Sequence, residues 1–266
     1  MKKGLYLLPS LFTLGNMGAG VYSIILSING RYPKAAFAIL AGIVFDILDG
    51  RIARITKTES KFGIELDSLA DLTSFGIAPA LLVYQVVLHH YGNLGGVISF
   101  LFIMAAAVRL ARFNTKADSG IPSAFFTGLP VPGAAGILAA FVLSYNTFIQ
   151  EITIRTIPMV TKNMPLMLRF MPVFMVILAY LMVSNIRYTS FKRLKIGKRK
   201  PIQYFIFIVL SAALVWLYPE NMILIIFIAY ILSGLFDVFY RLNNWSKLKG
   251  AGDNNLPKLR RSGDKK

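Results

Sequence analysis

Residues 45–80 read FDILDGRIARITKTESKFGIELDSLADLTSFGIAPA, and two pairs of aspartates stand out in this stretch. Asp46 and Asp49 are three residues apart, and Asp67 and Asp71 are four apart. These spacings place both members of a pair on one face of a helix. Because the connection between the pairs is short, we expect two antiparallel neighbouring helices whose carboxylates converge on one point.

The sequence on both sides of this stretch is that of an integral membrane protein. Of the 266 residues 56% are hydrophobic, whereas a soluble domain is about 45–50% apolar. Apolar runs of about 20 residues, each long enough to cross a bilayer core of about 30 Å, recur along the chain. We therefore predict an all-α fold, a polytopic transmembrane helical bundle of about eight spans, at residues 8–28, 34–54, 64–88, 94–113, 128–148, 168–187, 203–218 and 222–241. Six spans are the alternative if the fifth and sixth are re-entrant.

The distribution of charge predicts the orientation of the bundle. We place on one side the N-terminus, the connections after spans two, four and six, and the C-terminus. That side carries 24 of the 29 lysines and arginines, and the other side carries 5. Because basic residues collect in cytoplasmic loops, we expect both termini in the cytoplasm and a location in the cell or inner membrane. Topology and anionic lipid then explain the net charge of +17, and we expect no nucleic-acid partner.

The chain divides into one catalytic unit and a tail. We expect residues 1–246 to form a single transmembrane catalytic domain and residues 247–266 to form a basic, disordered cytoplasmic tail. The chain contains no cysteine, which excludes disulfide bonds and thiol catalysis.

The aspartate pairs predict a metal site at the cytoplasmic ends of their two helices. A carboxylate at membrane depth costs about 2.5–3.5 kcal/mol on insertion scales, and four of them near one point repel one another. Divalent cations offset both effects, and carboxylate oxygen is the ligand that Mg²⁺ and Mn²⁺ prefer. Four shared carboxylates suit two metal ions that clamp a phosphoryl group during its transfer. Helix capping explains Asp46 and Asp49 poorly, because the C-terminal end of a helix disfavours anions.

Residues beside the aspartates suit a phosphate ligand. Gly50 and Ala53 are small and allow a ligand to approach the helix closely. Arg54 continues the same face and can pair with a phosphate. Ser60 either caps the following helix or contacts a ligand, and the sequence leaves both possibilities open.

This pattern resembles the signature of the CDP-alcohol phosphatidyltransferase family. Residues 46–71 read D-x2-D-G-x2-A-R-x8-G-x3-D-x3-D, which matches every fixed position of that signature. The resemblance implies a helical membrane enzyme, a homodimer, that transfers the phosphatidyl group of a CDP-linked lipid to an alcohol and releases CMP. It implies that the four aspartates bind metal and that Asp71 also accepts the proton of the alcohol. It further implies a CDP-lipid site lined by Gly50, Arg54 and Ser60, with Ala53 beside them.

Sequence beyond the signature resembles the phosphatidylserine synthase branch of that family, over roughly residues 8–140. The matching stretches are LPSLFTLGN from Leu8, ELDSLAD from Glu65, SFGIAPA from Ser74, RLARFN from Arg109 and FTGLPVP from Phe126. The implied reaction is that of L-serine with CDP-diacylglycerol to give phosphatidylserine and CMP. The chain departs from the branch at Pro9-Ser10, where the branch commonly has Pro-Asn.

The residue chemistry agrees with such a transfer. A serine hydroxyl is a weak nucleophile and needs a positioned base, which Asp71 can supply, and we expect direct displacement without a phosphatidyl-enzyme intermediate. Candidates to bind the serine carboxylate or the lipid phosphates are Arg109, Arg112 and Asn114. A basic anchor at the cytoplasmic surface is the alternative for the two arginines. Candidates on the first span to contact the CDP-lipid are Thr13 and Asn16.

Three other functions remain open at this point. A sister enzyme would use glycerol phosphate or inositol phosphate, and these dianionic acceptors should demand additional basic side chains around the metal site. An archaeal-type ether CDP-lipid would replace the ester lipid. A cation transporter would spread its acids near the bilayer midplane over several helices, and many transporters contain internal repeats, which are not apparent in this sequence.

Overall fold

The computed structural model describes residues 7–56, 60–118, 126–149 and 158–188, together with residues 224, 225 and 228. Within these ranges the chain is helical apart from one pairing of two short strands. The helices are α1 (Leu7–Ile28), α2 (Tyr32–Thr56), α3 (Lys61–Asp71), the π-helical η2 (Leu72–Ile77), α4 (Ala78–Val86), the 3₁₀-helical η3 (Leu88–Tyr91), α5 (Asn93–Asp118), α6 (Val131–Ile149) and α7 (Pro158–Val183). The strands β1 (Phe126–Thr127) and β2 (Arg187–Tyr188) pair in antiparallel fashion.

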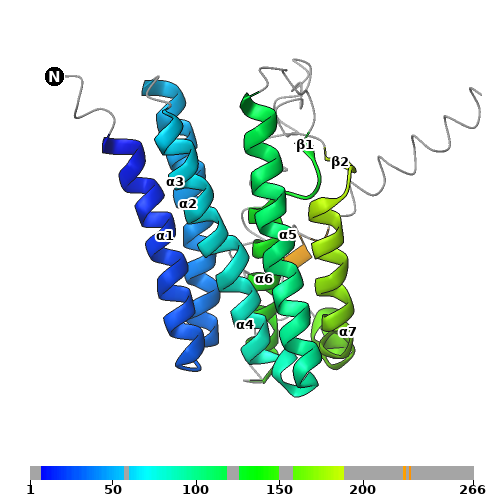
Figure 1. Ribbon diagram of the computed structural model, residues 1–266. Coiled ribbons are helices and arrows are strands. Elements are labelled where there is room, and N and C mark those ends of the chain that lie inside the picture. Colours follow the sequence, from blue (N-terminus) through cyan, green and yellow to red (C-terminus); the bar gives the residue numbers. More distant parts are fainter. Residues whose placement is uncertain are drawn as a thin grey trace, which may run out of the picture.

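The helices lie side by side as a bundle, with α1 packed along α2 and α5 packed along α7 (Figure 1). Among the described residues, four helical stretches are long and apolar enough to cross a membrane, namely Ser10–Ile28, Lys61–Val86, Asn93–Thr115 and Leu166–Val183. The predicted helical membrane protein is therefore confirmed, whereas the count of eight spans and the orientation stay predictions. The predicted spans at 203–218 and 222–241 lie outside the described residues apart from residues 224, 225 and 228, as does the predicted tail.

Two predicted spans differ from the helices that form. The third, residues 64–88, is not one continuous α-helix, because η2 interrupts it between α3 and α4. The sixth, residues 168–187, begins earlier, because α7 starts at Pro158. Proline lacks a backbone N–H group, but N–H groups in the first turn of a helix have no partner within the helix. Proline is therefore well tolerated as the first residue of α7. The same span ends earlier at Val183, and the residues that follow it contact the chain just before α6.

The π-helical turn η2 brings the chain after Asp71 against α1. A Cβ atom on Gly20 of α1 would lie 2.6 Å from the Cα of Ser74 in η2, so a side chain at this crossing would collide with backbone. The Ser74 hydroxyl donates a buried hydrogen bond of 2.7 Å to the Asn16 carbonyl. π-helical turns are rare and are frequently found at functional sites, and this one directly follows an aspartate of the signature.

Helix α6 forms the centre of the bundle. Most of its side chains from Val131 to Ser144 are buried, and α2, α4, α5 and α7 pack around it. A helix that is apolar on every side is one that neighbours cover on every side. Helices α2, α4, α5 and α7 therefore cover α6 from several sides.

One end of the bundle gathers several chain segments that are distant in sequence. Figure 1 shows the start of α1, the end of α2, the start of α3, the end of α5 and the β1–β2 pair at this end. The η3 turn, which carries His89 and His90, lies at the opposite end. These are the two groups of segments that the charge distribution assigns to opposite sides of the membrane.

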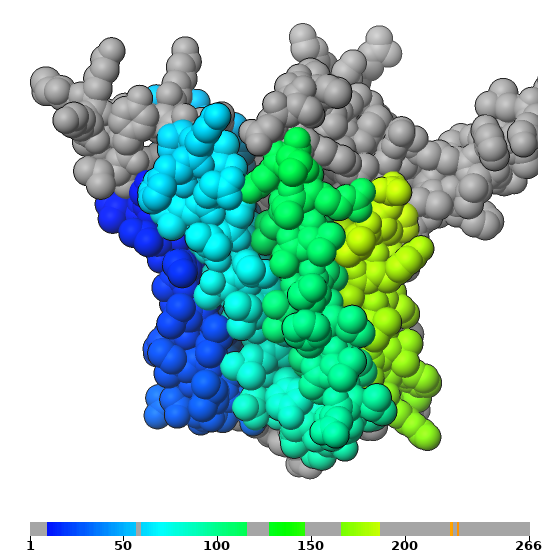
Figure 2. Space-filling view, viewed as in Figure 1, coloured from blue at the N-terminus to red at the C-terminus, as the bar shows by residue number. Residues whose placement is uncertain are grey.

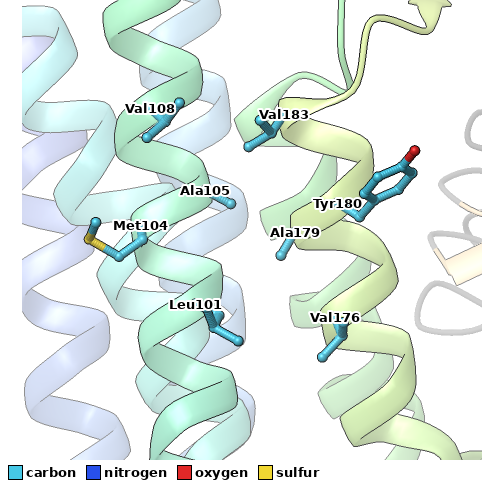
Figure 3. A pocket seen from close by; sticks show the side chains of 8 residues that line it. All are labelled: Leu101, Met104, Ala105, Val108, Val176, Ala179, Tyr180 and Val183. Carbon is cyan, nitrogen blue, oxygen red and sulfur yellow. The ribbon is translucent and has the colours of Figure 1, made fainter.

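The outward faces of α5 and α7 lie next to each other (Figure 2). They border an apolar groove with a volume of about 350 Å³, lined on one side by Leu101, Met104, Ala105 and Val108 and on the other by Val176, Ala179, Tyr180 and Val183 (Figure 3). Most of these side chains are exposed. Exposed apolar side chains on helices of this length are typical of a surface that faces lipid.

Candidate metal and active site

Three carboxylates from α2 and α3 meet toward the end of the bundle where α2 ends and α3 begins. Asp46, Asp49 and Asp67 each offer an oxygen atom, and these three atoms all lie within 4.8 Å of one another. Helix α1 packs against both α2 and α3, so it closes one side of this group, which we call the Asp triad. The three-residue spacing on α2 turns Asp46 and Asp49 to one side of the helix, where Asp67 faces them.

The Asp triad is suited to a divalent metal ion. Asp49 is only 5% exposed, and Asp46 and Asp67 are half-buried. Among the described residues, Asp49 Oδ2 and Asp67 Oδ1 are buried without a hydrogen-bond partner. Burial of an unpaired carboxylate oxygen is costly, and the three triad carboxylates repel one another at this distance. A hard cation bound by oxygen ligands would remove both costs, so the donor set fits a metal such as Mg²⁺ or Mn²⁺.

Asp71 lies next to the Asp triad, one helical turn after Asp67. It is 7% exposed, and the charges of all three triad members act on it. Its Oδ1 accepts a buried hydrogen bond of 3.0 Å from Asn16 Nδ2. The structure therefore brings the carboxylates of all four signature aspartates close enough to interact electrostatically. Three of them have oxygen atoms close enough together to bind one metal ion.

Helix α1 contributes two polar side chains to the carboxylates. Thr13 hydrogen-bonds with the Asp49 carboxylate, and Asn16 holds Asp71. Both side chains are buried. Sequence reasoning assigned Thr13 and Asn16 to the CDP-lipid and did not predict their contacts with the aspartates. The available signal was their spacing of three residues, which places two polar groups on one face of an apolar helix.

The residues that flank the aspartates make mostly local contacts. The Ser60 side chain is the N-cap of α3 and accepts a hydrogen bond of 3.0 Å from the Gly63 amide, so the structure has Ser60 as a cap. The exposed Arg54 donates from Nε to the Gly50 carbonyl at 2.7 Å. The Gly50 amide donates to the Asp49 carboxylate, and Ala53 is half-buried on the same helix.

The three candidates on α5 have different neighbours. The Arg109 guanidinium stacks 5.7 Å from the ring centroid of Phe113 and attracts the Asp46 carboxylate. Asn114 donates to the Ser68 hydroxyl at 2.9 Å and so ties α5 to α3. Arg109 and Asn114 therefore face the aspartate helices.

Arg112 points instead toward the end of α7. Its Nη1 donates to the Val183 carbonyl at 2.6 Å, and its Nη2 donates to Asn185 Oδ1 at 2.8 Å. A cation at the C-terminus of a helix satisfies carbonyls that the helix leaves unpaired. The sequence spacing alone could not show that α7 would end beside this arginine.

The arrangement has the parts that phosphoryl-group chemistry needs. The Asp triad can hold a cation against a pyrophosphate, a fourth carboxylate stands beside it, and Arg109 supplies a guanidinium that can bind an anion. All of these groups lie toward one end of the bundle, where a water-soluble reactant can meet a lipid.

Known proteins share this sequence pattern. A sequence model of the CDP-alcohol phosphatidyltransferase family matches residues 6–164. A protein of Helicobacter pylori named CDP-diacylglycerol–serine O-phosphatidyltransferase is 36% identical over 231 residues, which cover 87% of this chain and 90% of that protein. A Bacillus subtilis protein of the same name is 31% identical over 186 residues, or 70% of this chain and 92% of that protein. The archaetidylserine synthase of Methanothermobacter thermautotrophicus is 39% identical over 140 residues, or 52% of this chain and 58% of that protein.

Proposed function

This chain belongs to the CDP-alcohol phosphatidyltransferase family, and from that premise we propose that it transfers the phosphatidyl group of CDP-diacylglycerol to the hydroxyl of L-serine. The products are phosphatidylserine and CMP. The observation that carries the proposal is the Asp triad, with its buried carboxylate oxygens at mutual ligand distance. Serine is the proposed acceptor because the similar proteins of Helicobacter pylori and Bacillus subtilis are named for transfer to serine.

In this proposal Asp46, Asp49 and Asp67 hold Mg²⁺ or Mn²⁺, and Asp71 completes a site for two ions. A metal held by these residues would supply positive charge to neutralise the pyrophosphate and to stabilise the negative charge of the departing CMP. The support for this ligand set is the donor chemistry of the Asp triad together with the proximity of Asp71. Thr13 and the Gly50 amide hold the Asp49 carboxylate in place.

Asp71 is the proposed general base. It accepts the proton of the serine hydroxyl while the serine oxygen forms its bond to the phosphorus of the phosphatidyl group. The bond between that phosphorus and the oxygen of CMP breaks in the same displacement, so no covalent intermediate with the protein forms. The support is the position of Asp71 beside the Asp triad, where it can reach the hydroxyl of an acceptor that enters the site.

The remaining candidates are assigned by their positions. Arg109 is the best-placed guanidinium for the serine carboxylate or a lipid phosphate, because it is close enough to the Asp triad to attract the Asp46 carboxylate. Arg112 contributes less directly, since it is bonded to the end of α7. The proposed contacts with the CDP-lipid involve Gly50, Ala53, Arg54, Ser60 and Thr13. Asn16, the sixth candidate for this site, has no exposed surface and bonds to Asp71 instead. We place Asn114 near the acceptor because its partner Ser68 adjoins Asp67.

We also propose that the active site faces the cytoplasm of the cell or inner membrane. The end of the bundle that carries the Asp triad is the end with the basic segments, and basic segments stay on the cytoplasmic side. In this proposal residues 1–246 form the catalytic domain. The active oligomer is a homodimer whose interface is formed by membrane helices.

The proposal is tested by metal-dependent release of CMP from CDP-diacylglycerol by the purified protein in lipid vesicles. Serine, glycerol phosphate and inositol phosphate are supplied separately as acceptors. We expect release with Mg²⁺ or Mn²⁺ and serine, and none with chelator. Release of CMP that does not need serine would refute the assignment of serine as the acceptor. If no CMP is released with any of the acceptors, the proposed transferase activity is refuted.

An ether CDP-lipid is a second candidate substrate. The specific support is the similarity to an archaetidylserine synthase over 140 residues. The same vesicle assay with an ether CDP-lipid, run beside the ester lipid at equal concentration, decides between them by the ratio of their kcat/KM values.

A further inference from the structure

Asn16 is fully buried and is bonded to the proposed base. It is 0% exposed, and its amide nitrogen donates to Asp71 Oδ1 at 3.0 Å. A carboxylate only accepts hydrogen bonds, which assigns the nitrogen of the amide to the side of Asp71. Since the side chain has no exposed surface, Asn16 can affect a bound substrate only through the residues around it.

Among the described residues, Asn16 Oδ1 is buried without a hydrogen-bond partner. This oxygen faces Gly42 of α2, where a Cβ atom would lie only 3.0 Å away. Ser74 anchors the Asn16 backbone through the hydrogen bond of 2.7 Å to its carbonyl, and Gly20 lets Ser74 approach α1 this closely. The Asn16 backbone is therefore anchored to the π-helical turn that follows Asp71, and its amide lies between Asp71 and Gly42 of α2.

We infer that Asn16 is a positioning residue for Asp71. By binding Oδ1 it fixes the rotation of the carboxylate and leaves Oδ2 to face the hydroxyl of the acceptor. This inference rests on the proposed function, in which Asp71 accepts the acceptor's proton. It differs from a contact with the CDP-lipid, because the effect of Asn16 passes through Asp71 and belongs to the chemical step.

The test is Asn16→Leu, which keeps the branching at Cγ, is somewhat larger, and removes the donor. A misplaced catalytic group costs about 100-fold in rate, so we expect kcat to fall by about that factor while KM for CDP-diacylglycerol changes by less than about twofold. The matched control is Ser23→Ala on the same helix. Ser23 is also 0% exposed and donates a buried hydrogen bond of 2.9 Å to the Ala35 carbonyl, but it lies away from the aspartates. We expect Ser23→Ala to lower stability and keep kcat.

Gly42→Ala supplies a second variant in case Asn16→Leu does not fold. It retains the amide but places a methyl group against Asn16 Oδ1, so the amide must shift. We expect kcat to fall by about tenfold with KM unchanged.

The outcomes separate this inference from the proposed function. If wild-type enzyme releases no CMP with serine, the proposed function fails before any variant is measured. If wild type is active and Asn16→Leu retains its kcat, or loses activity only through KM, the positioning inference is overturned and the function stands. If Asn16→Leu does not fold, an unchanged kcat for Gly42→Ala overturns it.

Discussion

Gly20→Ala tests the packing that places η2 and Asp71 against α1. The added methyl group would collide with Ser74 Oγ and would lie 2.6 Å from Ser74 Cα. The hydroxyl can rotate away, but the Cα belongs to the backbone of η2, so the two segments must separate. Overpacking of this kind costs about 1–3 kcal/mol, and a contact with backbone belongs at the upper end of that range. Replacing glycine by alanine within a helix returns up to about 1 kcal/mol.

The matched control is Gly18→Ala, two residues earlier on the same helix. A Cβ atom on Gly18 meets nothing within 4 Å, so this variant receives only the gain in helix propensity. We expect Gly20→Ala to be less stable than Gly18→Ala by about 1–3 kcal/mol, the overpacking cost alone. Unfolding in mixed micelles of dodecyl maltoside and SDS measures the difference. Equal free energies of unfolding for the two variants would refute the close approach of α1 to η2.

Three further predictions concern the site and its supports. Asp49→Asn should weaken metal binding by more than about 100-fold, since loss of a residue that only hydrogen-bonds to a metal ligand already costs about 10–100-fold; calorimetry with Mn²⁺ measures it, and unchanged affinity would place the metal elsewhere. Asp71→Asn should fold and bind CDP-lipid, yet turn over about 10²–10⁴-fold more slowly because the base is lost; near-normal turnover in the CMP assay would show that another group takes the proton. Arg112→Ala should lower the free energy of unfolding by about 1.5–3 kcal/mol through loss of two charge-assisted hydrogen bonds; a drop in kcat with unchanged stability would instead indicate that Arg112 binds substrate.

Helix spacing and membrane chemistry made the main features predictable from sequence. Intervals of three and four residues place aspartates on one face of a helix. Asp46, Asp49 and Asp67 were therefore expected to meet if their two helices were neighbours. Apolar runs of sufficient length likewise specified membrane helices. These features depend on local sequence, which a single chain displays directly.

Other features depend on contacts between distant segments. The π-helical turn at Leu72–Ile77 forms where Ser74 meets Gly20, more than 50 residues earlier in the chain. Arg112 binds α7 because α7 happens to end beside it. Ser60 had two chemically reasonable functions, and only the geometry of α3 shows it as a cap. No periodic pattern in the sequence predicts these contacts.

The charged end of α2 has a consequence for how the protein enters the bilayer. Asp46, Asp49 and Arg51 lie within the part of α2 that would otherwise be apolar, and α2 is not among the four stretches suited to crossing a membrane by themselves. Only residues 29–31 separate α2 from α1, and the two helices pack along each other. We therefore expect the translocon to release α1 and α2 together as a helical hairpin, with the hydrophobicity of the first helix carrying the aspartates of the second into the lipid.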